Sequence, residues 1–196
     1  MIPTREEIGR ALRAAWRLFL NDPRGMAGFD LSVSGFWRSF GAIVPMAPFY
    51  FVGFLVERQL RLADPEQEAF SNATFFAAKA VIVAVDWVAF PIVLAILARQ
   101  LGIARGYPAF IVARNWASLL IIIPDSALAA AFGLGLVGQE IAGFASLAFL
   151  VIILRYRFLI ARIALGASIV FALGITFADV LLSLVLTAGL NRLFLD

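Results

Sequence analysis

The sequence predicts an all-α protein: a polytopic integral membrane helical bundle of five transmembrane helices, preceded by an amphipathic N-terminal helix. Three observations predict this fold class. Of the 196 residues, 63% are hydrophobic, whereas a soluble domain has about 45–50%. The apolar residues gather in five long segments, and most charged residues flank these segments. A chain this short has too much surface for its volume to hide so much apolar area from water, so we expect lipid to cover the excess.

Residues 1–35 are predicted to form a cytoplasmic amphipathic segment. Thr4 and Glu7 have the spacing of a capping box, and the helix should end before Pro23, because proline disfavours helical geometry in the residue before it. The apolar residues that recur at helical spacing are Ile8, Leu12, Ala15, Trp16 and Phe19. The arginines on the opposite face are Arg10, Arg13 and Arg17. Such a basic, aromatic-bearing helix is typical of one that lies flat in the lipid headgroups. The alternative is that it packs against the protein's own cytoplasmic loops.

Residues 36–196 are predicted to form the transmembrane bundle, because a crossing helix needs about 20 mostly apolar residues. We expect the crossings at about 36–56, 73–98, 107–136, 141–162 and 163–190. The apolar part of the fourth ends near Leu154 and is lengthened by snorkelling of Arg155 and Arg157. Pro124 lies inside the third, where we expect a kink or a short break. Splitting that segment at Pro124 would give six crossings, but each half would have only about 14–17 residues.

The distribution of basic residues predicts the orientation. The side that holds the N-terminus and the loops at 99–106 and 155–162 carries twelve of them, and the other side carries Arg58, Arg61, Lys79 and Arg192. The positive-inside rule then places the N-terminus in the cytoplasm and the C-terminus outside. The outer loop at 57–72 would hold the acidic residues Glu57, Asp64, Glu66 and Glu68. The preference for arginine over lysine and the abundance of alanine indicate a GC-rich genome. We expect the protein to lie in a bacterial inner (plasma) membrane.

Several ionisable residues lie within the predicted crossings. They are Asp86, Asp125, Asp179, Arg114 and Lys79. A charge at the bilayer centre costs at least about 2.5–3.5 kcal/mol, so each should face the bundle interior, water or a partner. One interpretation is a proton or cation path, with Pro91 and Pro124 freeing backbone carbonyls nearby.

The other interpretation is structural, and the absence of repeated halves typical of transporters favours it. Asp86 would then bond a hydroxyl group or Arg114 across a helix contact. Arg38 and Arg114 would otherwise extend to the cytoplasmic headgroups by snorkelling.

Composition argues against an enzyme. The chain has no histidine and no cysteine, which removes the commonest catalytic base, thiol nucleophiles and the usual zinc and haem ligands. The Gly-x-Gly-Asp surroundings of intramembrane aspartyl proteases are absent, as are phosphate-binding and dinucleotide-binding fingerprints. We therefore expect no catalytic residues, no cofactor and no metal.

The layout over about residues 36–194 resembles the Yip family of five-span membrane proteins, the Rab-GTPase-interacting type. The shared features are a cytoplasmic N-terminal segment, five closely spaced helices, a proline in the third helix, the basic stretch "RYRFLIAR" before the last helix, and an outside C-terminus. The Asp-Leu-Tyr-Gly-Pro signature of eukaryotic members has no counterpart here. The resemblance implies a membrane-organising or partner-binding role without catalytic residues.

Three functional hypotheses follow. The first is a non-catalytic inner-membrane protein that organises the membrane or binds lipids or partner proteins, with Arg10, Arg13 and Arg17 holding anionic lipid at about 1 kcal/mol per basic residue. The second is a secondary transporter or a proton- or cation-conducting protein that uses Asp86, Asp125 and Asp179. The third is an accessory subunit of a larger membrane complex. A membrane-protein partner or a homo-oligomer fits the first and third, and none of them involves nucleic acid.

Overall fold

The computed structural model describes residues 3–64 and 71–195, and every regular element within them is a helix. In chain order these are α1 (Arg5–Phe19), the 3₁₀ helix η1 (Pro23–Gly28), α2 (Val33–Ser39), the 3₁₀ helix η2 (Phe40–Ala42), α3 (Ile43–Ala63), α4 (Asn72–Leu97), α5 (Tyr107–Gly133), α6 (Gln139–Leu165) and α7 (Ile169–Leu195). Among the described residues, five helical stretches are long and apolar enough to cross a membrane, namely 33–63 and the helices α4, α5, α6 and α7. This confirms the predicted all-α bundle.

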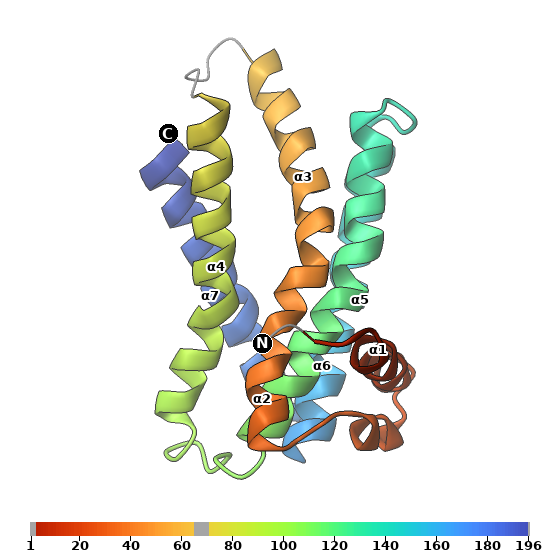
Figure 1. The fold of residues 1–196 in the computed structure, drawn as a ribbon, viewed down its shortest axis with the longest axis vertical. Coiled ribbons are helices and arrows are strands. Elements are labelled where there is room, and N and C mark those ends of the chain that lie inside the picture. The colour runs from red at the N-terminus through yellow and green to blue at the C-terminus, as the bar shows by residue number, and fades with distance from the viewer. Residues whose placement is uncertain (1–2, 65–70, 196) are drawn as a thin grey trace.

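The five long helices run side by side, and α1 lies across the bundle against α5 and α6 (Figure 1). Helix α3 packs on α5, α5 on α6, and α4 on α7. We call the end near α1, which includes the loops at 98–106 and 166–168, the α1 end. The opposite end, which includes the turn at 134–138 and the last turn of α7, is the far end.

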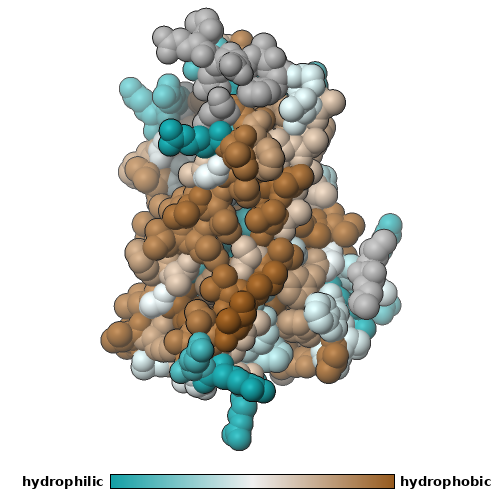
Figure 2. Space-filling view, turned by 90° about the vertical axis from the view of Figure 1, so that its left-hand side faces the viewer, coloured by the Kyte–Doolittle hydropathy of each residue, from teal (hydrophilic) through white to brown (hydrophobic). Residues whose placement is uncertain are grey.

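The outer surface of the bundle is apolar between its two ends. Figure 2 shows the face formed by α4 and α7 as a broad hydrophobic band, with hydrophilic groups gathered toward the ends. Exposed apolar side chains of α4 and α7 include Ile92, Ile96, Val170, Leu173 and Leu184. At a rise of about 1.5 Å per residue, helices of this length exceed the hydrocarbon thickness of about 30 Å. Their ends therefore extend beyond it.

Helix α1 begins as predicted but docks on the protein itself. The Thr4 side chain accepts a hydrogen bond from the backbone N–H of Glu7 at 3.2 Å, as in a capping box. The Glu7 carboxylate bonds Arg38 instead of returning to Thr4. The buried face of α1 consists of Ala11, Ala14, Ala15 and Leu18. The helix therefore packs against the protein, on the long helices α5 and α6 rather than on the loops that the alternative named.

Small residues let η1 approach α1 closely. A Cβ atom on Gly25 would lie 2.7 Å from the carbonyl oxygen of Ala14, and one on Gly28 would lie 2.8 Å from the Ala14 Cβ. Distances this short exclude a side chain at either glycine. The segment that follows α1 thus folds back and lines one side of it.

The first crossing differs from its predicted bounds at both ends. The first stretch begins at Val33, inside the predicted N-terminal segment, because Ser32 caps α2 through the Gly35 N–H at 3.1 Å. It continues to Ala63, beyond the predicted end at 56, because the polar side chains of its last turns find partners on α4. Glu66 and Glu68 lie outside the described residues.

The observed bounds of the later crossings also differ from the predicted ones. Helix α6 extends to Leu165, and Gly166 closes it with a φ of 59°, a conformation that suits glycine. Helix α7 therefore starts at Ile169 rather than at 163 and runs to Leu195. Helix α5 stays continuous through Pro124, so the short break and the six-crossing alternative were both wrong, and the kink stays a prediction.

Candidate functional site

The most buried ionic group joins three helices near the α1 end. Asp179 of α7 is 2% exposed and Arg114 of α5 is 6% exposed. Arg114 donates from Nη2 to Asp179 Oδ1 at 2.8 Å and from Nε to Oδ2 at 3.3 Å. Arg157 of α6 donates from Nη1 to the same Oδ2 atom. We call Arg114, Arg157 and Asp179 the ion triad.

The ion triad corrects two predictions about arginines. Arg114 and Arg157 were expected to reach the headgroups by snorkelling, but both turn inward to Asp179. A carboxylate buried in an apolar bundle carries a large desolvation penalty unless charged partners surround it. Arg114 makes this pair with Asp179, and within the described residues no hydrogen bond joins it to Asp86, for which it was one of the two expected partners.

The surroundings of the ion triad are tightly packed. The cavity beside it measures about 10 Å³ and is lined by Phe110, Ile160, Ile175 and Thr176 together with the triad. A cavity needs about 10–15 Å³ of probe-occupied volume to hold one water. Asp179 therefore acts as a polar bridge between helices, and the structure offers no room for a chain of waters at this point.

Asp86 and Asp125 are not part of this cluster. Asp86 is half-buried on α4, and Asp125 is exposed on α5. Within the part of the chain that the structure describes, neither carboxylate has a hydrogen bond or an ion pair. The three aspartates thus divide into one that is fully paired and two that face less enclosed surroundings.

Lys79 belongs to a second polar cluster at the far end. Its Nζ lies 2.5 Å from Glu57 Oε1 and donates to Asn191 Oδ1 at 2.8 Å. Arg61 contacts the same Glu57 oxygen at 3.3 Å and donates to the Leu195 carbonyl at 3.1 Å. This cluster ties α3, α4 and α7 together, so Lys79 has a structural partner on each side.

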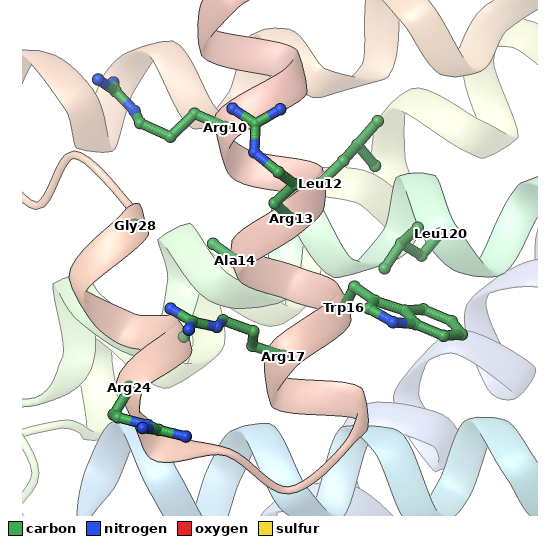
Figure 3. Close-up of a pocket in the computed structure, with 10 residues that line it drawn as sticks. Arg10, Leu12, Arg13, Ala14, Trp16, Arg17, Arg24, Gly28 and Leu120 are labelled. Carbon is green, nitrogen blue, oxygen red and sulfur yellow. The ribbon is translucent and has the colours of Figure 1, made fainter.

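A basic surface lies near the α1 end. Arg10, Arg13 and Arg17 are exposed on α1. With Arg24 of η1 they line an open hollow of about 650 Å³, which we call the basic hollow. Figure 3 shows these arginines around α1, while Trp16 projects from the same helix toward Leu120 of α5.

The charges of the basic hollow are only partly neutralised. Asp22 contacts Arg24 at 2.9 Å and Arg17 at 3.6 Å, and the hydrogen bond from Arg24 lowers the pKa of Asp22. Arg10 and Arg13 have no ion pair within the described residues. The basic hollow therefore offers net positive charge to an anion at the surface.

Sequence reasoning missed Arg157, Glu57 and Asn191 as members of these clusters. One signal for Arg157 was present, because Arg155 precedes it by two residues. Positions two apart on a helix lie about 200° apart around the axis, so the two arginines cannot both face the same way. Arg155 indeed turns to α1, where its Nη1 donates to the Phe19 carbonyl at 3.0 Å.

A metal site finds no support among residues 3–64 and 71–195, where no three acidic, cysteine or histidine side chains come together.

Comparisons with known proteins do not assign the chain to a family. No protein-family model matches the chain, and neither a curated protein nor a solved structure does. The resemblance to the Yip family stays a prediction.

Proposed function

We propose that the protein is a non-catalytic, multi-pass protein of the bacterial inner membrane that binds anionic phospholipids through α1 and so organises the cytoplasmic surface of that membrane. The proposal rests on one observation. Helix α1 is fixed to the bundle by its alanine face while Arg10 and Arg13 stay exposed without acidic partners among the described residues.

The docking of α1 determines which side chains it presents. The Tyr156 hydroxyl donates to the Ala15 carbonyl at 2.7 Å, and Arg155 bonds the Phe19 carbonyl at 3.0 Å. At the other end of α1, Arg38 bonds Glu7 at 3.1 Å. With both ends held, little conformational freedom is lost when a ligand binds the exposed face.

The depth of α1 suits this role. Tyr156, which holds α1, directly precedes Arg157 of the ion triad, so α1 lies level with the ion triad. An amphipathic helix with half-exposed Trp16 on its flank is suited to the boundary between headgroups and acyl chains. The ion triad joins α5 and α6, the two helices that carry α1, to α7, and so keeps this platform rigid.

The energy available is sufficient for selective binding. Each basic residue near an anionic surface contributes about 1 kcal/mol, so three arginines supply about 3 kcal/mol, or roughly two orders of magnitude in affinity. This contribution should decrease as salt is added, because exposed charges are screened.

Spin-labelled lipids test the proposal directly. The purified protein would be reconstituted into vesicles that contain spin-labelled phosphatidylglycerol or phosphatidylcholine, and the motionally restricted fraction of each lipid would be measured. We expect a preference for phosphatidylglycerol that R10Q/R13Q reduces strongly. R99Q/R105Q is the matched control, because it removes the same charge from exposed positions at the α1 end. Equal losses in both variants, or no loss in R10Q/R13Q, would contradict the proposal.

A second candidate function is proton or cation conduction. The observation that favours it is that half-buried Asp86 and exposed Asp125 have no hydrogen bond or ion pair within the described residues. Asp179 is less suited to such a path, because both of its oxygens accept hydrogen bonds from arginine. Flux in proteoliposomes that disappears in D86N or D125N would favour this candidate over lipid binding.

A further inference from the structure

An apolar groove of about 220 Å³ lies where α1, α5 and α6 meet. Its walls come from all three helices and include Trp16, Phe19, Leu120, Pro124, Phe149 and Ile153. Small-molecule pockets usually measure about 300–1,000 Å³, so this groove accepts a segment of one hydrocarbon chain rather than a whole lipid.

The groove and the basic hollow are continuous. Trp16 and Leu120 line both of them, and Figure 3 shows these two side chains approaching each other beside the arginines. Arg155, whose guanidinium lies 5.8 Å from the centre of the Phe19 ring, adds positive charge at the groove. An occupant that is apolar at one end and anionic at the other would satisfy both parts at once.

The aromatic wall of the groove is held in place before any ligand arrives. Trp16 stacks on Phe19 with 5.2 Å between ring centroids, and Phe19 meets the edge of Tyr156 at 5.3 Å. The Tyr156 hydroxyl is anchored on α1. A preformed apolar wall reduces the entropy lost on binding. Each methylene group of the acyl chain that it buries stabilises the complex further.

We propose that this two-part surface is a specific site for one anionic phospholipid, with an acyl chain in the groove and the phosphate against the arginines of the basic hollow. This inference rests on the proposed function and deepens it. A second copy of the chain fits less well, because the exposed face of α7 toward the α1 end presents apolar side chains such as Val170 and Leu173. These offer no negative charge to Arg10 and Arg13.

Tryptophan fluorescence can measure whether a lipid acyl chain lies in the groove, because the protein has four tryptophans with different exposure. Trp87 and Trp116 are 6% and 2% exposed, whereas Trp16 and Trp37 are 52% and 57% exposed. In a W37F background, Trp16 is therefore the tryptophan that lipid chains can reach. We would compare its quenching by phosphatidylglycerol with brominated chains and by phosphatidylcholine with the same chains, at equal mole fraction.

We expect brominated phosphatidylglycerol to quench Trp16 more strongly than brominated phosphatidylcholine. I153F fills the groove from α6 and should bring the two quenchers to parity. Ile121 of α5 also lines the groove, so I121F should have the same effect. V151F is the matched control, because Val151 is 66% exposed and does not line the groove. Because the two groove-filling substitutions lie on different helices, a fold defect in one variant would not be expected in the other.

The outcomes separate the two proposals. If R10Q/R13Q abolishes the preference while I153F and I121F retain it, lipid binding by charge stands and the groove site is overturned. If every variant retains the preference, both are overturned. If the groove-filling variants lose quenching by both lipids equally and R10Q/R13Q has no effect, the groove binds chains without regard to charge, and the specific anionic site is overturned.

Discussion

Arg114 of α5 and Asp179 of α7 form a two-point ion pair, with 2.8 Å between Nη2 and Oδ1 and 3.3 Å between Nε and Oδ2. The backbones of α5 and α7 scarcely approach each other elsewhere. The pair, completed by Arg157 from α6, therefore adds a direct polar link between two helices whose backbones pack little against each other. Its position level with α1 connects the stability of the bundle to the placement of the basic surface.

Replacing Asp179 with asparagine should destabilise the protein strongly. The change leaves two buried or half-buried guanidinium groups without a carboxylate, and removing one partner of a buried pair costs about 3–5 kcal/mol. Thermal unfolding in mild detergent, followed by circular dichroism, measures the effect. D86N is the control with a small effect, because Asp86 makes no hydrogen bond within the described chain.

An apolar rescue variant tests whether the charge itself is needed. Replacing Arg114 and Arg157 with methionine and Asp179 with leucine removes every charge of the ion triad at similar volume. Such replacements are often neutral or stabilising, so we expect most of the stability lost in D179N to return. A D179N protein as stable as the parent would show that the ion triad does not hold the helices together.

Replacing Lys79 with methionine should cost less. The Glu57 side chain, 36% exposed, keeps Arg61 at 3.3 Å when Lys79 is removed. The loss should not exceed about 1.5–3 kcal/mol, the range for a hydrogen bond to a charged group. Hydrogen exchange should show faster opening of the far-end turns of α4 and α7, with the α1 end unchanged. Uniform faster exchange in all helices would contradict a local role.

The sequence predicts the membrane-length helices, which depend on hydropathy, but not the ion pairs between them, which depend on how each helix is rotated about its axis. Hydropathy identifies the crossings because every membrane-length helix needs the same apolar length. The pairing of Asp179 with Arg157 depends on how α6 and α7 are rotated, and a one-residue change turns a side chain by about 100°. The docking face of α1 was visible as Ala11, Ala14, Ala15 and Leu18 at helical spacing. The larger apolar side chains beside it, such as Trp16 and Phe19, instead predicted a different packing face.

The contacts that Asp30 makes with Ser32 and with Arg38 of α2 should weaken in acid. Hydrogen bonds from Ser32, with a contribution from Arg38 at 2.5 Å, hold the pKa of Asp30 below its ordinary value. A carboxyl group with a lowered folded-state pKa contributes stability above its unfolded pKa, about 3.9. That contribution is lost as the pH falls through the folded-state value. Unfolding measured from pH 7 to pH 3 should show this loss, and D30N should flatten that part of the profile. An unchanged profile in D30N would rule Asp30 out as its source.

Cysteine accessibility should decide between lipid binding and ion conduction, because the chain has no cysteine of its own. Single cysteines at Asp86 and Asp125 would be exposed to a membrane-impermeant thiol reagent in intact cells and in inside-out vesicles. For a lipid-binding protein we expect protection at both positions in both preparations, since these side chains then meet protein and acyl chains. S71C, exposed at the far end, should react in intact cells, and R99C at the α1 end should react only in inside-out vesicles. A denatured sample shows that each thiol is reactive. Labelling at 86 or 125 under native conditions would mean that water reaches these carboxylates, and conduction would become the better account of the protein.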